Sequence, residues 1–216
     1  MIDLYAFATP NSIKVLIMLE ELGLDYQLHS VNIRQGQQKL PSFLQLNPNA
    51  KVPVIVDHDN VDTALVLTES AAILLYLAEK TGLLLPTDPA LRARLFEHLF
   101  LHASGLSPAF GQSGYFLRLA PAPIEHAIQR FSGEAHRLTG LLDQGLAGKE
   151  FMLGSELSIA DIAHFGWFWR SEFAGISLKD FSNLELWYNR LSERPAVIRA
   201  IEKINSIAAS QERPNA

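Results

Sequence analysis

The pattern of apolar and polar positions predicts a small α/β unit at the start of the chain. Residues 2–7 form a short apolar run that is typical of a strand, and a Thr-Pro-Asn-Ser turn follows at 9–12. Residues 13–22 then carry apolar side chains at helical spacing, and Gly23 suits the left-handed residue after a helix. The predicted order is therefore strand, tight turn and helix.

The same alternation continues to residue 82. The segments in order are a strand at 25–33, a polar loop at 35–39, a short helix at 41–46, two β-branched runs at 50–57 and 64–68 joined by a turn at 58–62, and a helix at 70–80. The order β-α-β-α-β-β-α within this length is typical of one small α/β domain.

Beyond this unit the pattern is helical. Helices are expected at 90–102, 121–146, about 157–169, 184–192 and 195–208, whereas 105–114 is expected to be loop-like or kinked because it contains a proline and three glycines. We therefore predict an α/β plus all-α protein. Its parts are an N-terminal domain over 1–82, a linker over 83–89 and an α-helical domain over 90–209.

Composition narrows the class of protein. The 216 residues are 48% hydrophobic and 19% charged, as in an ordinary globular protein. The net charge of −5 leaves no basic surplus to neutralise phosphates, so we expect no nucleic-acid partner. The longest apolar run, 71–78, is too short to span a bilayer, and the chain enters a strand at once. We expect a cytoplasmic protein without a membrane partner.

The chain contains no cysteine. This excludes disulfides, thiolate metal sites and a nucleophilic cysteine. Any thiol chemistry must use a thiol that a ligand brings.

The turn at 9–12 places hydroxyl and amide groups at the start of the first predicted helix. A helix N-terminus carries free N–H donors and the positive end of the helix dipole, so it suits an anion or a thiolate. Asn11 or Ser12 can equally serve as an ordinary helix cap, and the turn by itself favours that simpler role.

Four separated motifs connect this turn to the rest of the chain. They are Thr9-Pro10-Asn11-Ser12, Lys51-Val52-Pro53, Thr68-Glu69-Ser70 and Leu157-Ser158-Ile159-Ala160-Asp161, the last with the spacing of a capping box. Together they resemble the glutathione S-transferase superfamily over essentially the whole chain. The first motif, Gln38 and residues 69–77 look most like its bacterial nu class.

The resemblance implies a thioredoxin-like N-terminal domain, an α-helical C-terminal domain, a homodimer and glutathione as the ligand. In thioredoxin-like folds the reactive thiol lies at the N-terminus of the first helix, which lowers its pKa. Here that place holds no sulfur, so the thiolate would belong to glutathione. Thr9 and Asn11 would then be the catalytic residues that stabilise it.

The Val52–Pro53 bond resembles the family's cis-proline turn. This implies that the N–H and C=O of Val52 pair with the cysteinyl part of glutathione as one strand pairs with another. The alternative is a trans proline that begins an edge strand.

The remaining implied contacts hold the polar ends of glutathione. Glu69 would bind the γ-glutamyl ammonium group and Ser70 its carboxylate, although Ser70 also suits a plain N-cap. Gln38 and Lys51 would flank the other polar groups of the peptide. Arg130 stands where the nu class has an arginine from the helical domain, although it could also lie on a solvated helix face.

Two other features receive simpler interpretations. Tyr5 lies inside the first strand, so we expect it to pack rather than to act on a thiol. His98 and His102 are four residues apart on one helix but lack an evident third ligand, so we expect no metal.

The function that follows from the resemblance is a glutathione-dependent thiol–disulfide oxidoreductase, with weak reduction of organic hydroperoxides. An alternative is a transferase that conjugates glutathione to an electrophile. A further alternative is a non-catalytic, transferase-like binding module. The sequence does not identify the second substrate, which would be a small disulfide, peroxide or electrophile.

Overall fold

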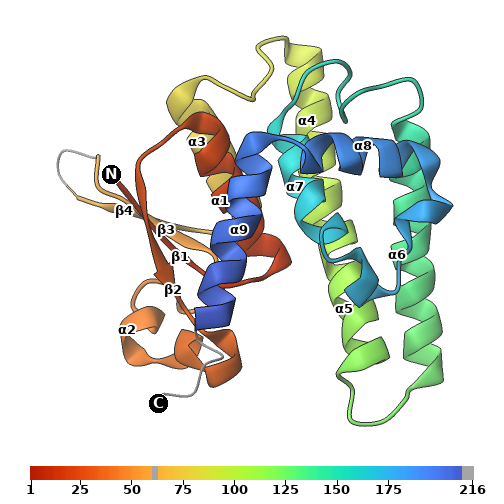
Figure 1. Ribbon diagram of the computed structural model, residues 1–216, viewed down its shortest axis with the longest axis horizontal. Helices are drawn as coiled ribbons and strands as arrows, with labels where there is room; N and C mark the ends of the chain where they lie inside the picture. The colour runs from red at the N-terminus through yellow and green to blue at the C-terminus, as the bar shows by residue number, and fades with distance from the viewer. Residues whose placement is uncertain (60–62, 211–216) are drawn as a thin grey trace. The chain divides into compact units, whose positions relative to one another are not determined.

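The computed structural model describes residues 1–59 and 63–210, and these form two compact units (Figure 1). The first unit comprises Met1–Leu83 and the described residues from Glu193 on, and the second comprises Leu84–Ser192. The predicted turn at 58–62 lies partly outside the described residues. The predicted domain limits at 82, 83–89 and 90–209 stay a prediction.

The first unit contains a four-stranded mixed sheet with the order β2-β1-β3-β4. Strand β1 (Ile2–Ala6) pairs in parallel with β2 (Tyr26–Ser30). Strand β3 (Val54–Asp57) is antiparallel to both β1 and β4 (Leu65–Thr68). The predicted hairpin of β3 and β4 is confirmed.

Strand β1 lies inside the sheet, between β2 and β3, and its alternate apolar residues face the same side. Ile2, Leu4 and Ala6 are buried, and Leu4 lies opposite Leu28 of β2 and Ile55 of β3. The residues between them point to the other face of the sheet. The register thus gives each face its own set of side chains.

Helices cover both faces of this sheet (Figure 1). Helix α1 (Pro10–Leu22) packs against α3 (Ser70–Thr81) and α9 (Pro195–Ser210). On the opposite face, Phe43 of the short helix α2 (Pro41–Leu44) packs near Tyr5. This is the predicted thioredoxin-like arrangement, with the last helix of the chain added to it.

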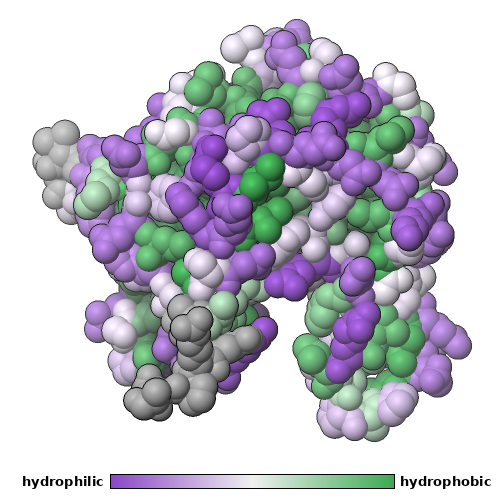
Figure 2. Space-filling view, viewed as in Figure 1, coloured by the Kyte–Doolittle hydropathy of each residue, from purple (hydrophilic) through white to green (hydrophobic). Residues whose placement is uncertain are grey.

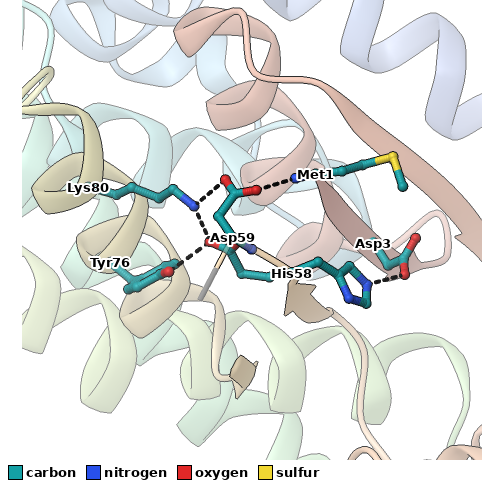
Figure 3. Close-up of polar contacts among 7 residues, drawn as sticks. Met1, Asp3, His58, Asp59, Tyr76 and Lys80 are labelled. Atoms are coloured by element: carbon teal, nitrogen blue, oxygen red, sulfur yellow. Dashed lines mark hydrogen bonds and ion pairs between the residues drawn. The ribbon is translucent and has the colours of Figure 1, made fainter. Parts of the chain in front are cut away.

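A polar network fixes α3 to the end of β3 (Figure 3). Asp57 is fully buried, and it accepts hydrogen bonds from the hydroxyl of Tyr76 at 2.7 Å and from Lys80 Nζ at 2.5 Å. Lys80 also donates to Asp59 at 2.8 Å, and Asp59 accepts from the amino group of Met1. These bonds fix the position of α3, whose N-terminus carries two predicted site residues.

Ion pairs attach α9 to the C-terminal part of α1. Arg194 binds Glu21 through two nitrogens at 2.6 and 2.8 Å, while Arg199 and Lys203 both bind Glu20. The visible face of α9 is accordingly largely hydrophilic in Figure 2. These contacts lie at the end of α1 that is remote from its N-cap.

The second unit is helical, as predicted. Its helices are α4 (Pro89–Leu101), α5 (Ser107–Arg118), α6 (Glu125–Gly145), α7 (Ile159–Phe168) and α8 (Ser182–Ser192). Helix α7 is buried along its whole length and forms the core of the unit. Figure 2 shows exposed hydrophobic residues near the C-terminal end of α5.

The predicted capping box of α7 is present. Ser158 accepts from the N–H of Ala160, and the Asp161 carboxylate accepts from the N–H of Ser158 at 3.0 Å. Asp161 is buried and also accepts from the N–H of Met152 and from Nε1 of Trp187. Every one of these bonds is internal to the unit.

The segment 105–114 was predicted to be loop-like or kinked, and of these two alternatives the loop is wrong. This segment consists of a π-helical turn, His102–Leu106, that runs directly into α5. One of its glycines serves close packing: a Cβ at Gly114 would lie 2.0 Å from the ring of Phe173. A glycine in a helix can mark such a contact as well as a break.

The polar segment at 35–39 is also more regular than predicted. Strand β2 ends at Ser30, and two 3₁₀ turns follow at Ile33–Gln35 and Gln37–Lys39. The side chain of Asn32 caps the first turn by accepting from two backbone N–H groups. In the second unit, further 3₁₀ turns lie at Ser171–Ala174 and Leu178–Asp180.

Candidate functional site

Thr9 is the N-cap of α1, whereas Asn11 or Ser12 was expected in this role from the sequence. Its Oγ1 accepts from the N–H of Ser12 at 3.1 Å and its hydroxyl donates to Ser12 Oγ at 2.9 Å. The N–H of Thr9 donates to the carbonyl of Phe7 at 2.6 Å. Both donors of Thr9 therefore point to groups within the turn.

Asn11, in the first turn of α1, has a different environment. It is half-buried, and its Oδ1 accepts from Lys14 Nζ at 2.7 Å. The carbonyl side of the amide is thus turned toward the lysine, and its Nδ2 donors point away from it. Within the part of the chain that the structure describes, Nδ2 makes no hydrogen bond. An acceptor from outside the protein can take this position.

The Val52–Pro53 bond is cis, which confirms the cis alternative. Val52 is half-buried and lies outside β3. Neither its N–H nor its C=O makes a hydrogen bond to another described residue. Two backbone groups just before the start of β3 are thus open to an extended peptide.

The loop before this bond is shaped by Asn47, which is buried. Its amide donates to the carbonyl of Lys51 at 2.8 Å, and its Oδ1 accepts from the N–H of Asn49 at 3.0 Å. Ala50 has a φ of 54° in the same loop. The loop is therefore held from inside, while the side chain of Lys51 is exposed.

Glu69 and Ser70 begin α3. Glu69 is its N-cap residue with φ 66° and ψ 112°, a left-handed conformation that is unfavourable for a residue with a Cβ. Its exposed side chain makes no capping bond to the helix. Ser70 follows at the first helical position, and its Oγ accepts from Lys14 Nζ at 3.5 Å. A carboxylate and a free helix N-terminus therefore lie side by side.

Gln38 also has an unused polar atom. Its Oε1 is buried and has no hydrogen-bond partner among the described residues. Buried amide oxygens are nearly always paired, so this atom suits a donor from a ligand. Lys51 is less constrained because it is exposed.

Arg130 lies on α6 in the second unit, so the structure does not relate it to the residues above. It is exposed. The pKa of Glu134 is lowered mainly by the hydrogen bond from Arg137, and the charge of Arg130 adds a smaller effect in the same direction, while burial opposes both. The solvated helix face that we considered is thus consistent with its position.

Lys14 is the residue that the sequence interpretation missed. It is 1% exposed, and its amino group joins Asn11 to Ser70 across two helices. Burial lowers the pKa of Lys14 to about 7, and the negative charge of Glu69 opposes this shift. The available signal was a lysine inside the apolar run Ile13–Leu19, where a solvated side chain is not expected.

His98 and His102 lie close to a third histidine, His164. His164 of α7 lies between His98 and His102, with ring nitrogens 3.3 Å from the first and 3.4 Å from the second. Each nitrogen of His164 faces a different histidine, so the three rings do not converge on one point. Over residues 1–59 and 63–210, no group of three or more His, Cys, Asp or Glu could hold a metal ion.

A cavity of about 920 Å³ lies in the second unit, lined in part by Arg118, Trp169 and Tyr188. None of the predicted glutathione-binding residues contributes to it. No helix in the described ranges has both the length and the apolar character needed to cross a membrane.

Comparison with known proteins identifies relatives along nearly the whole chain. It is 42% identical to the disulfide-bond oxidoreductase YfcG of Escherichia coli over 205 residues, which are 94% of this chain and 95% of that protein. It is 39% identical to the disulfide-bond oxidoreductase YghU of the same organism, over 92% of this chain and 73% of that protein.

Solved structures of relatives have the same fold. A glutathione transferase from Burkholderia graminis, solved with two glutathione molecules per subunit, is 40% identical with a TM-score of 0.86 and covers 93% of this chain and 87% of its own. One from Pseudomonas putida, solved with one glutathione disulfide per subunit, is 38% identical with a TM-score of 0.85 and covers 92% and 90%.

Two family profiles match the chain, one in its α/β part and one in its helical part. The glutathione S-transferase N-terminal domain profile matches residues 8–80, which contain Asn11 in the first turn of α1 and the start of α3. The glutathione S-transferase C-terminal domain profile matches residues 108–195 in the helical part. With relatives above 30% identity over more than nine tenths of its length, the chain belongs to the glutathione S-transferase family.

Proposed function

We propose that the protein is a glutathione-dependent disulfide oxidoreductase. The observation that carries this proposal is the open amide donor of Asn11 at the N-terminus of α1, in a chain without cysteine. A donor beside the positive end of a helix dipole lowers the pKa of a thiol. The thiolate stabilised there is that of bound glutathione.

The reaction consists of two thiol–disulfide exchanges. The glutathione thiolate attacks one sulfur of a disulfide, so that a mixed disulfide forms and the other sulfur leaves as a thiolate. A second glutathione thiolate attacks the glutathione sulfur of the mixed disulfide and releases the remaining substrate thiolate. Two glutathiones become one glutathione disulfide, and two electrons reduce the substrate.

The remaining predicted residues seat the glutathione peptide. Val52 pairs with the cysteinyl backbone through its open N–H and C=O, and Gln38 supplies its unpaired Oε1. Glu69 takes the γ-glutamyl ammonium group and Ser70 its carboxylate at the start of α3. Lys51 contributes charge at the edge of this site.

We propose different roles for Arg130 and Thr9. Arg130 is exposed and carries a charge that suits a carboxylate of the ligand. Thr9 shapes the turn that presents Asn11, since its own donors are directed to Ser12 and Phe7. This assigns most of the thiolate stabilisation to Asn11.

The relatives support the choice of reaction. The two Escherichia coli proteins are named disulfide-bond oxidoreductases, and solved relatives hold two glutathiones or one glutathione disulfide per subunit. Two glutathiones are consumed in the overall reaction, and their disulfide is its oxidised product. We propose further that this protein is of the nu class, that it is a homodimer, and that it also reduces organic hydroperoxides weakly.

We also infer that it works in the cytoplasm. Its reaction consumes reduced glutathione, and the cytosolic glutathione pool is held strongly reducing. An oxidising compartment would supply the product and not the reactant.

Side-by-side turnover of a small disulfide, an organic hydroperoxide and an aryl halide with glutathione tests the choice of reaction. We expect the disulfide to give the largest kcat/KM. Faster conjugation of the aryl halide would identify a conjugating transferase. If glutathione and glutathione disulfide at millimolar concentration leave the melting temperature unchanged, the protein is a non-catalytic binding module.

A double variant, Thr9→Val with Asn11→Ala, tests the assigned residues. We expect disulfide turnover to be abolished while the circular dichroism spectrum stays that of the wild type. Asn205→Ala, at an exposed position of α9, is the matched control and should keep full turnover. Unchanged turnover in the double variant would contradict the assignment.

A further inference from the structure

Lys14 is a charged residue in a place where the fold does not need one. It lies in α1 between apolar neighbours, and it is 1% exposed. Removing an ammonium group from water costs free energy unless other groups compensate for it. Burial holds the pKa of Lys14 at about 7, so the compensation in the free protein is incomplete. A methionine of similar length would fill the same space without this cost.

The contacts of Lys14 connect the two ends of the proposed glutathione site. Its Nζ lies 2.7 Å from Asn11 Oδ1, on the thiol side, and 3.5 Å from Ser70 Oγ, on the γ-glutamyl side. The charged group whose field reaches Lys14 is Glu69, the N-cap residue of α3. One buried ammonium group therefore touches a residue of each helix N-terminus.

An ammonium group has only donors, and this determines how its neighbours are oriented. Asn11 must present its oxygen to Lys14, which turns Nδ2 and its two hydrogens the other way. Ser70 must accept with its oxygen, which leaves its hydroxyl hydrogen free to donate elsewhere. Without Lys14 the Asn11 amide could flip, and its oxygen would then repel a thiolate.

We propose that Lys14 is a positioning residue that orients Asn11 and Ser70 as hydrogen-bond donors toward the thiolate and the γ-glutamyl carboxylate of glutathione. This inference rests on the proposed function and extends it to a residue that does not touch the ligand. The positive charge of Lys14 adds to the helix dipoles at both ends of the site. Its field is strong because the group is shielded from water.

A second consequence concerns protons. Glutathione brings a carboxylate and a thiolate close to Lys14, and nearby negative charge raises the pKa of an ammonium group. Glu69 already acts in this direction, and the ligand adds to it. Binding near neutral pH should therefore be accompanied by proton uptake at Lys14.

The test compares the wild type with Lys14→Met, which keeps length and apolar character, and with Lys179→Met at an exposed position of the second unit. The first readout is the pKa of the bound glutathione thiol, from thiolate absorbance against pH. We expect Lys14→Met to raise it by about one unit, which is about a tenfold loss of thiolate below the pKa. Lys179→Met should leave it unchanged.

The second readout is the binding of S-methylglutathione, which has no thiol to ionise. Titration calorimetry in two buffers of different ionisation enthalpy gives the affinity and the protons taken up. We expect weaker binding and no proton uptake in Lys14→Met. The wild-type measurement also tests the proposal by itself: absence of proton uptake between pH 6.5 and 8 would overturn the second consequence, even if the variant does not fold.

The results separate this inference from the proposed function. If the wild type reduces disulfides and Lys14→Met keeps both the thiol pKa and the affinity within twofold, the inference is wrong and the function stands. If Lys14→Met shifts both values but the wild type shows no disulfide turnover, the proposed function is wrong and the inference stands. A wild type that does not bind glutathione overturns both.

Discussion

Two helix N-termini in this protein use similar residues for opposite purposes. At α7, Ser158 and the buried Asp161 satisfy each other, and Met152 and Trp187 complete the bonding of the carboxylate. At α1, Thr9 Oγ1 accepts from the N–H of Ser12 and its hydroxyl donates to Ser12 Oγ, while the N–H of Thr9 donates to Phe7. However, Asn11 keeps an amide donor without a partner among the described residues.

The two helix N-termini differ in the ionisable side chain that lies beside each of them. The carboxyl group of Asp161 accepts hydrogen bonds from Met152, Ser158 and Trp187 at the start of α7, so this terminus is already occupied by a group of the protein. Lys14 is a buried cation beside the α1 terminus, so the attraction for an anion increases there. A closed cap with its own carboxylate stabilises a fold, whereas an open cap backed by a cation suits a ligand.

Substitution of the closed cap should have the largest effect. Asp161→Ala leaves the N–H groups of Met152 and Ser158 and the indole N–H of Trp187 buried without an acceptor. We expect the free energy of unfolding to fall by about 3 kcal/mol, measured by urea denaturation. Glutathione should still stabilise whatever fraction stays folded. A loss below about 0.5 kcal/mol would show that these bonds are not important.

Substitution of the open cap should leave stability intact and remove activity. We expect Asn11→Ala to lower kcat/KM for disulfide reduction by about 10²-fold. Removal of one pre-positioned hydrogen-bond donor to an anion in an active site lowers the rate by about this factor. The free energy of unfolding of Asn11→Ala should change by less than about 0.5 kcal/mol. Asn11→Asp is a sharper variant, because it puts a negative charge beside the thiolate and should be no more active than Asn11→Ala. Near-wild-type turnover in Asn11→Asp would remove the basis of the comparison.

Thr9 should show an intermediate behaviour. Thr9→Ala removes a capping oxygen and should destabilise the protein by about 1 kcal/mol in thermal or urea denaturation. Thr9→Ser keeps the oxygen and is the matched control. Because the donors of Thr9 point to Ser12 and Phe7, we expect kcat/KM to fall less than in Asn11→Ala. A larger fall than in Asn11→Ala would assign the thiolate donor to Thr9 instead.

The smallest expected effect is a pH dependence of stability from the helical unit. Burial lowers the pKa of His98, and Lys149 and Arg94 add to the shift while Glu97 opposes it. An unfolded histidine takes up its proton at about pH 6.5, whereas folded His98 does so at lower pH. Neutral His98 thus makes its full contribution to the free energy of unfolding above about pH 6.5, and this contribution is lost as the pH falls below that value.

Urea denaturation between pH 7.5 and 5 measures this slope. His98→Gln should flatten the slope, and the control His126→Gln, at an exposed position of α6, should not. An identical slope in the wild type and in His98→Gln would show that other groups cause the pH dependence.

Features with a local cause could be predicted from the sequence. Gly23 after α1, the hairpin of β3 and β4 and the capping box at Ser158 all depend on neighbours within a few residues. The family resemblance then supplied the cis bond at Val52, which local residues alone left undecided. The order of sheet and helices followed from these elements.

The errors and omissions have long-range causes. The segment 105–114 was predicted to be loop-like or kinked because of its proline and glycines, whereas it is helical and Gly114 makes room for Phe173. Lys14 acquires its role only when Ser70, 56 residues further along, comes within reach of its amino group. Such a relation cannot be seen in hydrophobic spacing, although a lysine in an apolar helical run marks a position to inspect.

The pKa of the glutathione thiol in the complex tests the central claim most directly. The open cap of α1, with Asn11 and Lys14, is proposed to hold glutathione as a thiolate. We predict a thiol pKa in the wild-type complex at least about one unit below that of a free thiol, near 8.5, and a partial return toward it in Asn11→Ala. A bound thiol in the wild type that titrates at the same pH as free glutathione would contradict the account.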